Sequence, residues 1–189
     1  LSMQVNAGII TMDQSLGDYG FNFSISSTDN QTFSAILTNT SIGTYSDPLI
    51  DLIAFNLFND YNITFDNIST GWSFESGGNN TSFMWIGSSL SPGDRLAIGD
   101  SVAFDILFDN IVDWDAFILA GPTSGAGIGG GEDFGQVAVS FQQLGIDGED
   151  SDLLAGSWVS SSAVNSPGTL LLLGLGLVGM VFLSRKRKA

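Results

Sequence analysis

Cysteine and histidine are both absent from the 189 residues of this chain, and lysine first appears at position 186. Their absence excludes the common zinc sites, Ser-His-Asp triads and Cys-His pairs, all of which need a thiol or an imidazole. Schiff-base and Ser-Lys chemistry need a lysine amine, so both are excluded before position 186. A disulfide framework is impossible as well, and a folded domain must therefore rely on its core.

Basic residues are also scarce. Four of the five lie at 185–188, which leaves 20 acidic residues against Arg95 alone, a net charge of −19, in the preceding region. Nucleic-acid binding is excluded, because Lys and Arg side chains are what neutralise phosphates. Such an anionic surface favours solubility and divalent-cation binding, and it repels anionic polymers unless cations bridge them.

Apolar and polar residues alternate with a period of two in several segments, which is typical of strands that bury one face. Polar turn clusters separate these segments. The run Leu49–Phe58 is apolar on both faces, as in a central strand, with a short helix as the alternative. The four clearest inward-facing sets are Phe21, Phe23 and Ile25; Phe33, Ala35 and Leu37; Val102, Phe104, Ile106 and Phe108; and Val137, Val139 and Phe141.

Eight or more short strands with polar turns predict an all-β fold, an antiparallel β-sandwich of jelly-roll or immunoglobulin-like type. We expect one acidic sandwich domain over residues 8–155 and a flexible linker of small polar residues over 156–166. Residues 1–7 end in Val5-Asn6-Ala7, which a signal peptidase tolerates before its cut. They are expected to be a signal-peptide remnant, with an ordinary disordered start as the alternative.

The tail combines an uncharged run at 168–183 with the basic cluster Arg185, Lys186, Arg187 and Lys188. As a helix, the run is about 24 Å long, short of the roughly 30 Å hydrocarbon core of a membrane. Snorkelling of the basic side chains and local thinning make up the difference. The basic cluster favours a cytoplasmic C-terminus, so the sandwich is expected outside. A transmembrane helix at 168–183 is therefore predicted, with a buried core helix as the alternative.

A short motif with proline, a glycine- and leucine-rich span and an Arg/Lys end resembles the PEP-CTERM sorting signal. The usual motif is Val-Pro-Glu-Pro, and this chain has Val164, Asn165, Ser166 and Pro167, matching at the outer two positions. The resemblance covers residues 163–189. It implies processing by an exosortase, a membrane-bound cysteine protease, and association with the cell envelope, extracellular polysaccharide or biofilm matrix.

Four acidic residues crowd into six positions at Asp147, Glu149, Asp150 and Asp152. Hard cations such as Ca²⁺ take clustered oxygen ligands, but the spacing is not that of an EF-hand, since Asp152 occupies the place of its glycine. A loose Ca²⁺ site in a sandwich loop is one hypothesis, and an acidic turn is the alternative. No other cofactor is expected.

Aromatic and acidic residues raise two further hypotheses. Trp72, beside Gly71, and Trp114, between two aspartates, are candidate surface platforms for carbohydrate, whereas Trp85 is expected in the core. Asp113 and Asp115 form a carboxylate pair of the type used in glycoside hydrolysis. Acidic residues in loops are usually solvated, and the chain is expected not to be an enzyme.

Together these features predict an exported cell-surface or matrix protein with a structural or adhesive role, sorted through its tail. The first alternative is a permanently anchored single-span membrane protein with a carbohydrate-binding sandwich. The second is an exported carboxylate-dependent glycoside hydrolase.

Overall fold

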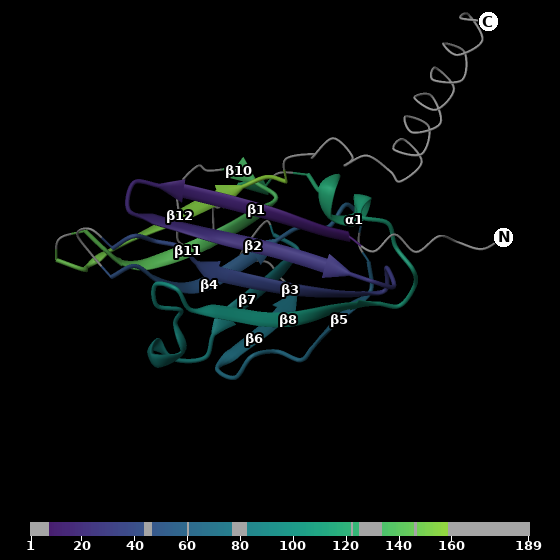
Figure 1. Ribbon diagram of the computed structural model, residues 1–189, viewed down its shortest axis with the longest axis horizontal. Helices are drawn as coiled ribbons and strands as arrows, with labels where there is room; N and C mark the ends of the chain where they lie inside the picture. Colours follow the sequence, from purple (N-terminus) through teal and green to yellow (C-terminus); the bar gives the residue numbers. More distant parts are fainter. Residues whose placement is uncertain are drawn as a thin grey trace, which may run out of the picture. The chain divides into compact units, whose positions relative to one another are not determined.

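The computed structural model describes residues 8–43, 47–59, 61–76, 83–121, 123–124, 134–145 and 147–158 (Figure 1). Strands dominate this part of the chain, as the two-residue alternation predicts. They are β1 (Gly8–Leu16), β2 (Tyr19–Ser27), β3 (Thr32–Asn39), β4 (Leu49–Phe55), β5 (Ile63–Asp66), β6 (Trp72–Ser76), β7 (Trp85–Ser89), β8 (Ser101–Phe108), β9 (Thr123–Ser124), β10 (Phe134–Gly135), β11 (Val137–Leu144) and β12 (Asp150–Gly156). Short helices are η2 (Pro92–Asp94) and α1 (Asp115–Ile118).

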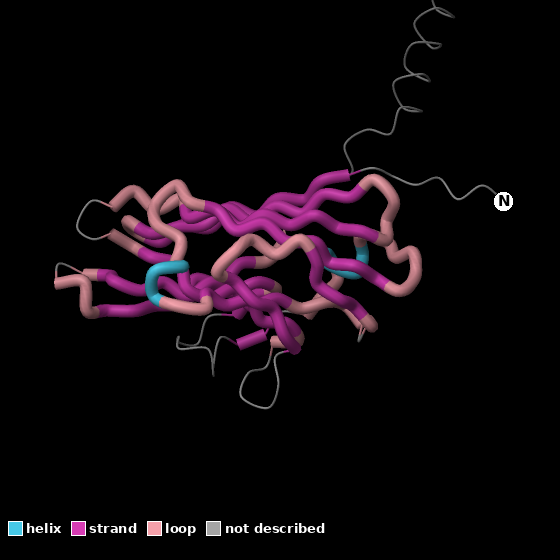
Figure 2. The backbone as a smooth tube through the Cα atoms, turned by 90° about the horizontal axis from the view of Figure 1, so that it is seen from below, coloured by secondary structure: helices cyan, strands magenta, loops and turns pink. Residues whose placement is uncertain are grey.

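Two five-stranded sheets form the sandwich, and their strands pair in antiparallel fashion throughout. One sheet has the order β1-β2-β3-β8-β5, the other has the order β12-β11-β4-β7-β6, and β9 and β10 form a separate two-stranded ribbon. Figure 2 shows the two sheets as stacked layers. The predicted antiparallel β-sandwich is therefore confirmed.

Aromatic side chains fill the space between the layers. All four predicted inward-facing sets are buried, with exposed fractions of 3% or less. Phe104 lies at the centre, with its ring 6.3 Å from that of Phe23, 6.1 Å from that of Phe65 and 4.0 Å from that of Phe74. Aromatic pairs at such separations add stability beyond the apolar area that they bury.

The run that is apolar on both faces forms β4, the middle strand of its sheet, and the helical alternative is wrong. Ile50 and Ile53 enter the main core. On the outer face, Ala54 joins a second buried cluster with Phe83 and Leu153. Burial on both faces explains why this strand lacks alternation.

The sandwich extends beyond the predicted start of the linker at residue 156. Gly156 pairs with Val137 in the sheet, and Trp158 is 8% exposed with its ring 5.7 Å from that of Phe23. The linker prediction therefore began too early, because the small residues around Trp158 hid a core position. Residues 1–7 and everything from 159 onward, including the predicted helix at 168–183, lie outside the described residues.

Within the described ranges, no helix is both long enough and apolar enough to cross a membrane.

Candidate functional site

The first of two notable hollows lies on the outer face of the sheet that contains β4, and we call it the Asp51 groove. Its volume is about 270 Å³, just below the range of roughly 300–1,000 Å³ for small-ligand pockets. Side chains of β4, of β7 and of the segment that follows β7 form its walls. They are Asp51, Leu52, Ser88, Ser89, Leu90, Ser91, Pro92 and Arg95.

A β-bulge places Asp51 in this groove. Leu52 pairs with Ser140 of β11 and Ile50 pairs with Phe141, so Asp51 is the extra residue between two paired ones. Such a bulge redirects a side chain that regular alternation would place elsewhere. Asp51 therefore reaches the polar side chains of β11, although its neighbour Ile50 is fully buried in the core.

Electrostatics distinguish the groove from the rest of the surface. An Arg95 nitrogen, Nη2, lies 4.0 Å from Asp51 Oδ2, at the limit of an ion pair, and these side chains are 26% and 22% exposed, respectively. Burial raises the pKa of the Asp51 carboxyl, while a hydrogen bond from Ser140 and the charge of Arg95 act in the opposite direction. Asp51 Oδ1 and Arg95 Nε are buried without a hydrogen-bond partner. These two unpaired atoms lie beneath the groove surface, and the other atoms of both side chains are partly exposed.

The segment that carries Arg95 is held in place from two sides. Leu96 and Ile50 exchange two backbone hydrogen bonds, of 3.0 and 2.9 Å, which tie the segment to β4. From β6, Trp72 donates its indole N–H to the Asp94 carbonyl at 2.9 Å. The groove wall is therefore fixed by backbone pairing and by a core indole.

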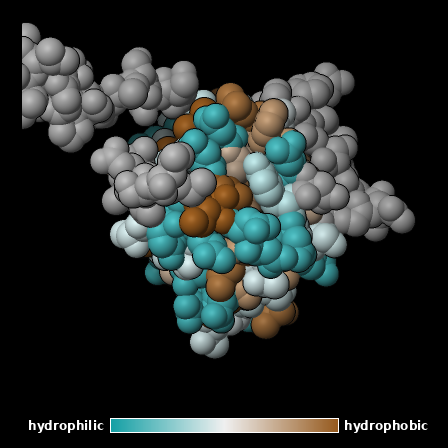
Figure 3. Space-filling model, turned by 90° about the vertical axis from the view of Figure 1, so that its right-hand side faces the viewer, coloured by the Kyte–Doolittle hydropathy of each residue, from teal (hydrophilic) through white to brown (hydrophobic). Residues whose placement is uncertain are grey.

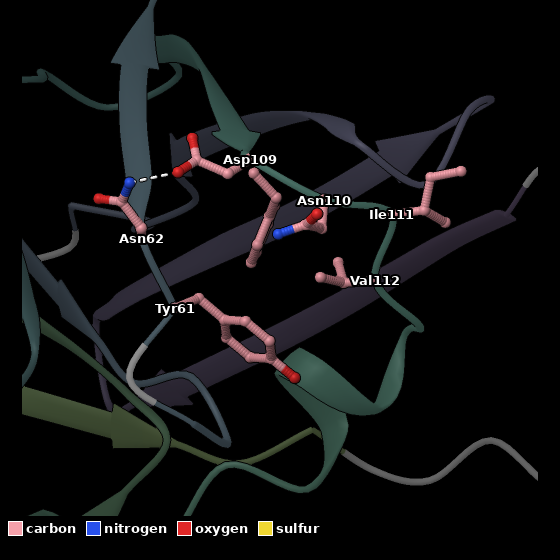
Figure 4. Close-up of a pocket in the computed structure, with 7 residues that line it drawn as sticks. Tyr61, Asn62, Asp109, Asn110, Ile111 and Val112 are labelled. Carbon is pink, nitrogen blue, oxygen red and sulfur yellow. Dashed lines mark hydrogen bonds between the residues drawn. The ribbon is translucent and has the colours of Figure 1, made fainter.

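The second hollow, the Tyr61 pocket, lies where β5 begins and β8 ends (Figure 4). Its volume is about 190 Å³. The Tyr61 and Phe108 rings meet edge to face with centroids 5.3 Å apart, and Asn62 donates a hydrogen bond to the Asp109 carboxylate. Figure 4 shows this polar pair on one side of the hollow, with the Tyr61 hydroxyl directed away from it. No basic residue lines this pocket.

Apolar side chains are exposed around this end of the sandwich, which Figure 3 faces. Ile111 on the pocket rim is 54% exposed, Phe58 is 52% exposed and Leu119 is 50% exposed. The backbone N–H of Phe58 donates to Ala116 of α1 at 2.7 Å, which brings Phe58 to the same end. In Figure 3, apolar atoms gather in the middle of the view and hydrophilic atoms surround them. A mixed surface of this kind suits weak contacts, whereas the Asp51 groove contains a carboxylate whose pKa is raised, a feature that is frequent at functional sites and also occurs in structural ion pairs.

The two tryptophans predicted to contact carbohydrate are not equivalent surface platforms. Trp72 is 6% exposed and belongs to the core, so its placement on the surface was wrong. Sequence context misled here, because Gly71 opens a turn that folds Trp72 inward over Asp94. Trp114 is partly buried, with its ring 5.1 Å from that of Phe33 and at right angles to it. Trp85 is also partly buried against the core, as predicted.

The predicted calcium ligands do not gather into a metal site, since no group of three or more acidic residues with suitable geometry occurs among the described residues. Asp152 instead accepts a hydrogen bond from the Tyr19 hydroxyl and one from the Leu153 N–H at 2.8 Å. Asp150 lies on β12 opposite Leu144. Calcium stabilisation stays a prediction, and an unchanged melting temperature between chelator and millimolar Ca²⁺ would contradict it.

The carboxylates of the hydrolase hypothesis flank Trp114 at the start of α1. Asp113 accepts a backbone hydrogen bond from Ala116 at 3.0 Å, and Asp115 occupies the first turn. Both side chains are exposed. They fit a helix start, where acidic residues are favourable.

Sequence reasoning missed Asp51 and Arg95 as partners. The available signal was that Arg95 is the single basic residue before position 185, in a region that otherwise carries 20 acids.

Comparison with known proteins identifies one segment of the chain, its C-terminal tail. Residues 167–188 match the family model described as the PEP-CTERM protein-sorting motif. The predicted resemblance is therefore confirmed, with Pro167 as the first matched residue and the basic cluster inside the match. None of the curated proteins matches the chain. The motif supports an exported cell-surface protein that is sorted by an exosortase.

Proposed function

We propose that this protein is a structural or adhesive component of the cell surface or extracellular matrix, with the sandwich as its exposed part. The observation that carries the proposal is the sorting motif at 167–188 on a chain whose preceding region has a net charge of −19. We further propose that the tail enters the membrane with the basic cluster in the cytoplasm before processing.

Mass spectrometry of the exported protein tests the sorting step. Cells with an exosortase should release a mature chain that lacks everything after about residue 167, and deletion of the exosortase gene should leave the tail attached. A Pro167→Ala variant should slow processing, whereas a matched Ala163→Gly variant, outside the matched residues, should not. Retention of residues 185–188 in the exported protein would overturn processing and favour permanent anchoring.

We propose that the chain performs no catalysis. Asp51 is the one described carboxylate whose pKa burial raises, and its neighbour is a guanidinium. Glycoside hydrolysis uses a pair of carboxylates, and Asp51 is the one carboxylate among the residues that line the groove. Hydrolytic activity that falls on Asp113→Asn or Asp115→Asn substitution would overturn this proposal and revive the hydrolase.

Neutral carbohydrate binding in the Asp51 groove is a second candidate function. Sugar hydroxyls both donate and accept hydrogen bonds, so they fit the partly exposed carboxylate and guanidinium that line the groove. Serine hydroxyls and the apolar faces of Leu52, Leu90 and Pro92 complete such a surface. The net charge favours neutral polymers over uronic-acid polymers, which like charge would repel.

A glycan array with neutral and uronic-acid polysaccharides tests this candidate. Binding to neutral glycans should weaken in Ser89→Ala and Asp51→Asn variants and persist in the matched control Ser101→Ala, which alters the other sheet. If Trp114→Phe abolishes binding and the groove variants have no effect, the carbohydrate site lies at Trp114 and not in the groove. The absence of any binding would remove the candidate without affecting the sorting proposal.

A further inference from the structure

β1 is the outermost strand of its sheet. β1 pairs with β2 without interruption, from Gly8 opposite Ser27 to Leu16 opposite Tyr19. On its other side, no strand among the described residues pairs with it. A free edge exposes unpaired backbone N–H and C=O groups, which is a template for pairing with another chain. We propose that β1 pairs with the β1 strand of a second copy of this chain, which joins two sheets into one.

The other three edge strands are less suited to such pairing. β5 has only 4 residues and β6 only 5. β12 carries Asp150 and Asp152, and its register against β11 shifts between Phe141 and Leu144. Short strands, charges and irregular pairing are devices that protect edges. β1 has 9 residues, regular pairing, no proline and no lysine, and Asp13 is its single charge.

Charge and symmetry select one register for the pair. An antiparallel arrangement with a two-fold axis at Met12 pairs all 9 residues of each strand and places Thr11 opposite Asp13 of the second copy, twice. Thr11 and Asp13 both lie on the exposed face of β1, since Met12 between them is 3% exposed. A hydroxyl opposite a carboxylate is favourable, whereas a register centred on Asp13 would oppose two carboxylates.

Long-range electrostatics oppose the pair, because each copy brings a net charge of −19 before the tail. Salt screens this repulsion with a Debye length of roughly 8 Å at physiological ionic strength. Backbone hydrogen bonds between the strands are short-ranged and scarcely affected. Association should therefore strengthen as salt rises from low to physiological concentration, opposite to an association driven by attraction between unlike charges.

Charge variants at Thr11 test both the surface and the register. Lysine at this position would face Asp13 of the second copy twice, so T11K should tighten the dimer, and T11D should weaken it. Cross-strand charge pairs of typical strength change the dissociation constant by about 2- to 30-fold in total. S24K and S24D are matched controls, because Ser24 is the β2 partner of Thr11 and shares its face but lies inside the sheet. Lysine and aspartate at position 24 should each change the dissociation constant only slightly, and by similar amounts.

Sedimentation equilibrium of the full chain, kept in detergent for its apolar tail, provides the measurement at 20 and 150 mM salt. A dimer that T11K tightens and T11D weakens supports the proposal. Three results would overturn it: a monomer at every concentration, a dimer indifferent to Thr11, or equal responses to the Thr11 and Ser24 variants. The last two would place the association elsewhere, for instance in the tail. If T11D fails to fold by circular dichroism, T11K still decides.

Discussion

Gly87 on β7 is a core position with no room for a single added methyl group. It is buried and lies opposite Phe74 of β6 on one side and Ile53 of β4 on the other. A Cβ atom built on Gly87 would lie 2.5 Å from Cζ of Phe74 and closer still to Cε1. The Phe74 ring therefore rests on the bare glycine backbone. This ring in turn contacts Phe65 and Phe104, with centroids 5.0 and 4.0 Å away.

We expect Gly87→Ala to lower the free energy of unfolding by about 1–2 kcal/mol. Overpacking typically costs about 1–3 kcal/mol, because the ring must leave its stacked position. Replacing a strand glycine by alanine recovers roughly 0.5–1 kcal/mol of backbone entropy. For a domain of this size, the net loss lowers the melting temperature by roughly 2–8 °C.

Urea unfolding of a double-mutant cycle checks the cause. In a Phe74→Ala background the ring is gone, so Gly87→Ala should be neutral or slightly stabilising, which corresponds to a coupling of about 1–3 kcal/mol. Gly93→Ala is the matched control, since its nearest neighbour would be Ser91 Oγ at 3.8 Å. The reasoning is refuted if Gly87→Ala destabilises equally with and without the Phe74 ring.

Three further substitutions have defined outcomes. Trp72→Phe removes the hydrogen bond to the Asp94 carbonyl and should lower the free energy of unfolding in urea by about 1–3 kcal/mol. An unchanged free energy of unfolding would contradict the buried position of Trp72. Asn39→Ala removes the side-chain donor to the Pro48 carbonyl at 2.7 Å, one of the two donors to the Leu96 carbonyl, and the acceptor of the Ser41 N–H at 3.1 Å, and it should cost about 2–4 kcal/mol. Backbone N–H groups of Thr32 and Gln31 lower the pKa of Asp29, so it stabilises the fold above its unfolded pKa and loses this effect as pH falls through its folded pKa. Asp29→Asn should therefore be less stable than the parent at pH 7, and this difference should shrink as pH falls through the folded pKa; a difference that does not change with pH would contradict this cause.

The layered fold could be predicted from the sequence because its signal is local. Phe21, Phe23 and Ile25 all lie in one strand, and their alternation requires one buried face whatever the partner strand. Strand order was not predictable, because β3 pairs with β8 across more than sixty residues and nothing in either strand specifies the other. Antiparallel pairing tolerates many partners whose apolar faces match.

The sandwich boundary and Trp72 were mispredicted for a related reason. Each prediction took small and polar neighbours as evidence of a surface position, since loops are rich in such residues. Trp72 follows a glycine with a φ of 86°, which only a turn would need, and this turn directs the indole inward. Trp158 follows Gly156 and Ser157 and still packs on Phe23. Large aromatic side chains are buried because of their own area, even where the flanking sequence is polar.

The Asp51 groove escaped prediction because it depends on a bulge. With regular alternation, Ile50 and Leu52 would share one face of β4 and Asp51 would take the other. The inserted residue lets Asp51 and Leu52 line the same groove while Ile50 stays in the core. A one-residue irregularity in strand pairing does not change the apolar–polar period of the sequence. The isolated basic residue Arg95 was the one sequence feature that pointed to this groove.

The position of Arg95 affects the electrostatics of the groove more than the net charge of the protein. Against 20 acids, one arginine alters the net charge very little, and an exposed pair with a carboxylate would contribute at most about 1 kcal/mol. Here the arginine lies on the segment tied to β4 by Leu96 and beside the carboxyl whose pKa burial raises. Without Arg95, Asp51 would be a half-buried charge on a strongly negative surface, which favours its protonation. Arg95 therefore opposes the effect of burial on the pKa of Asp51, and it places the one basic side chain found before position 185 in this groove.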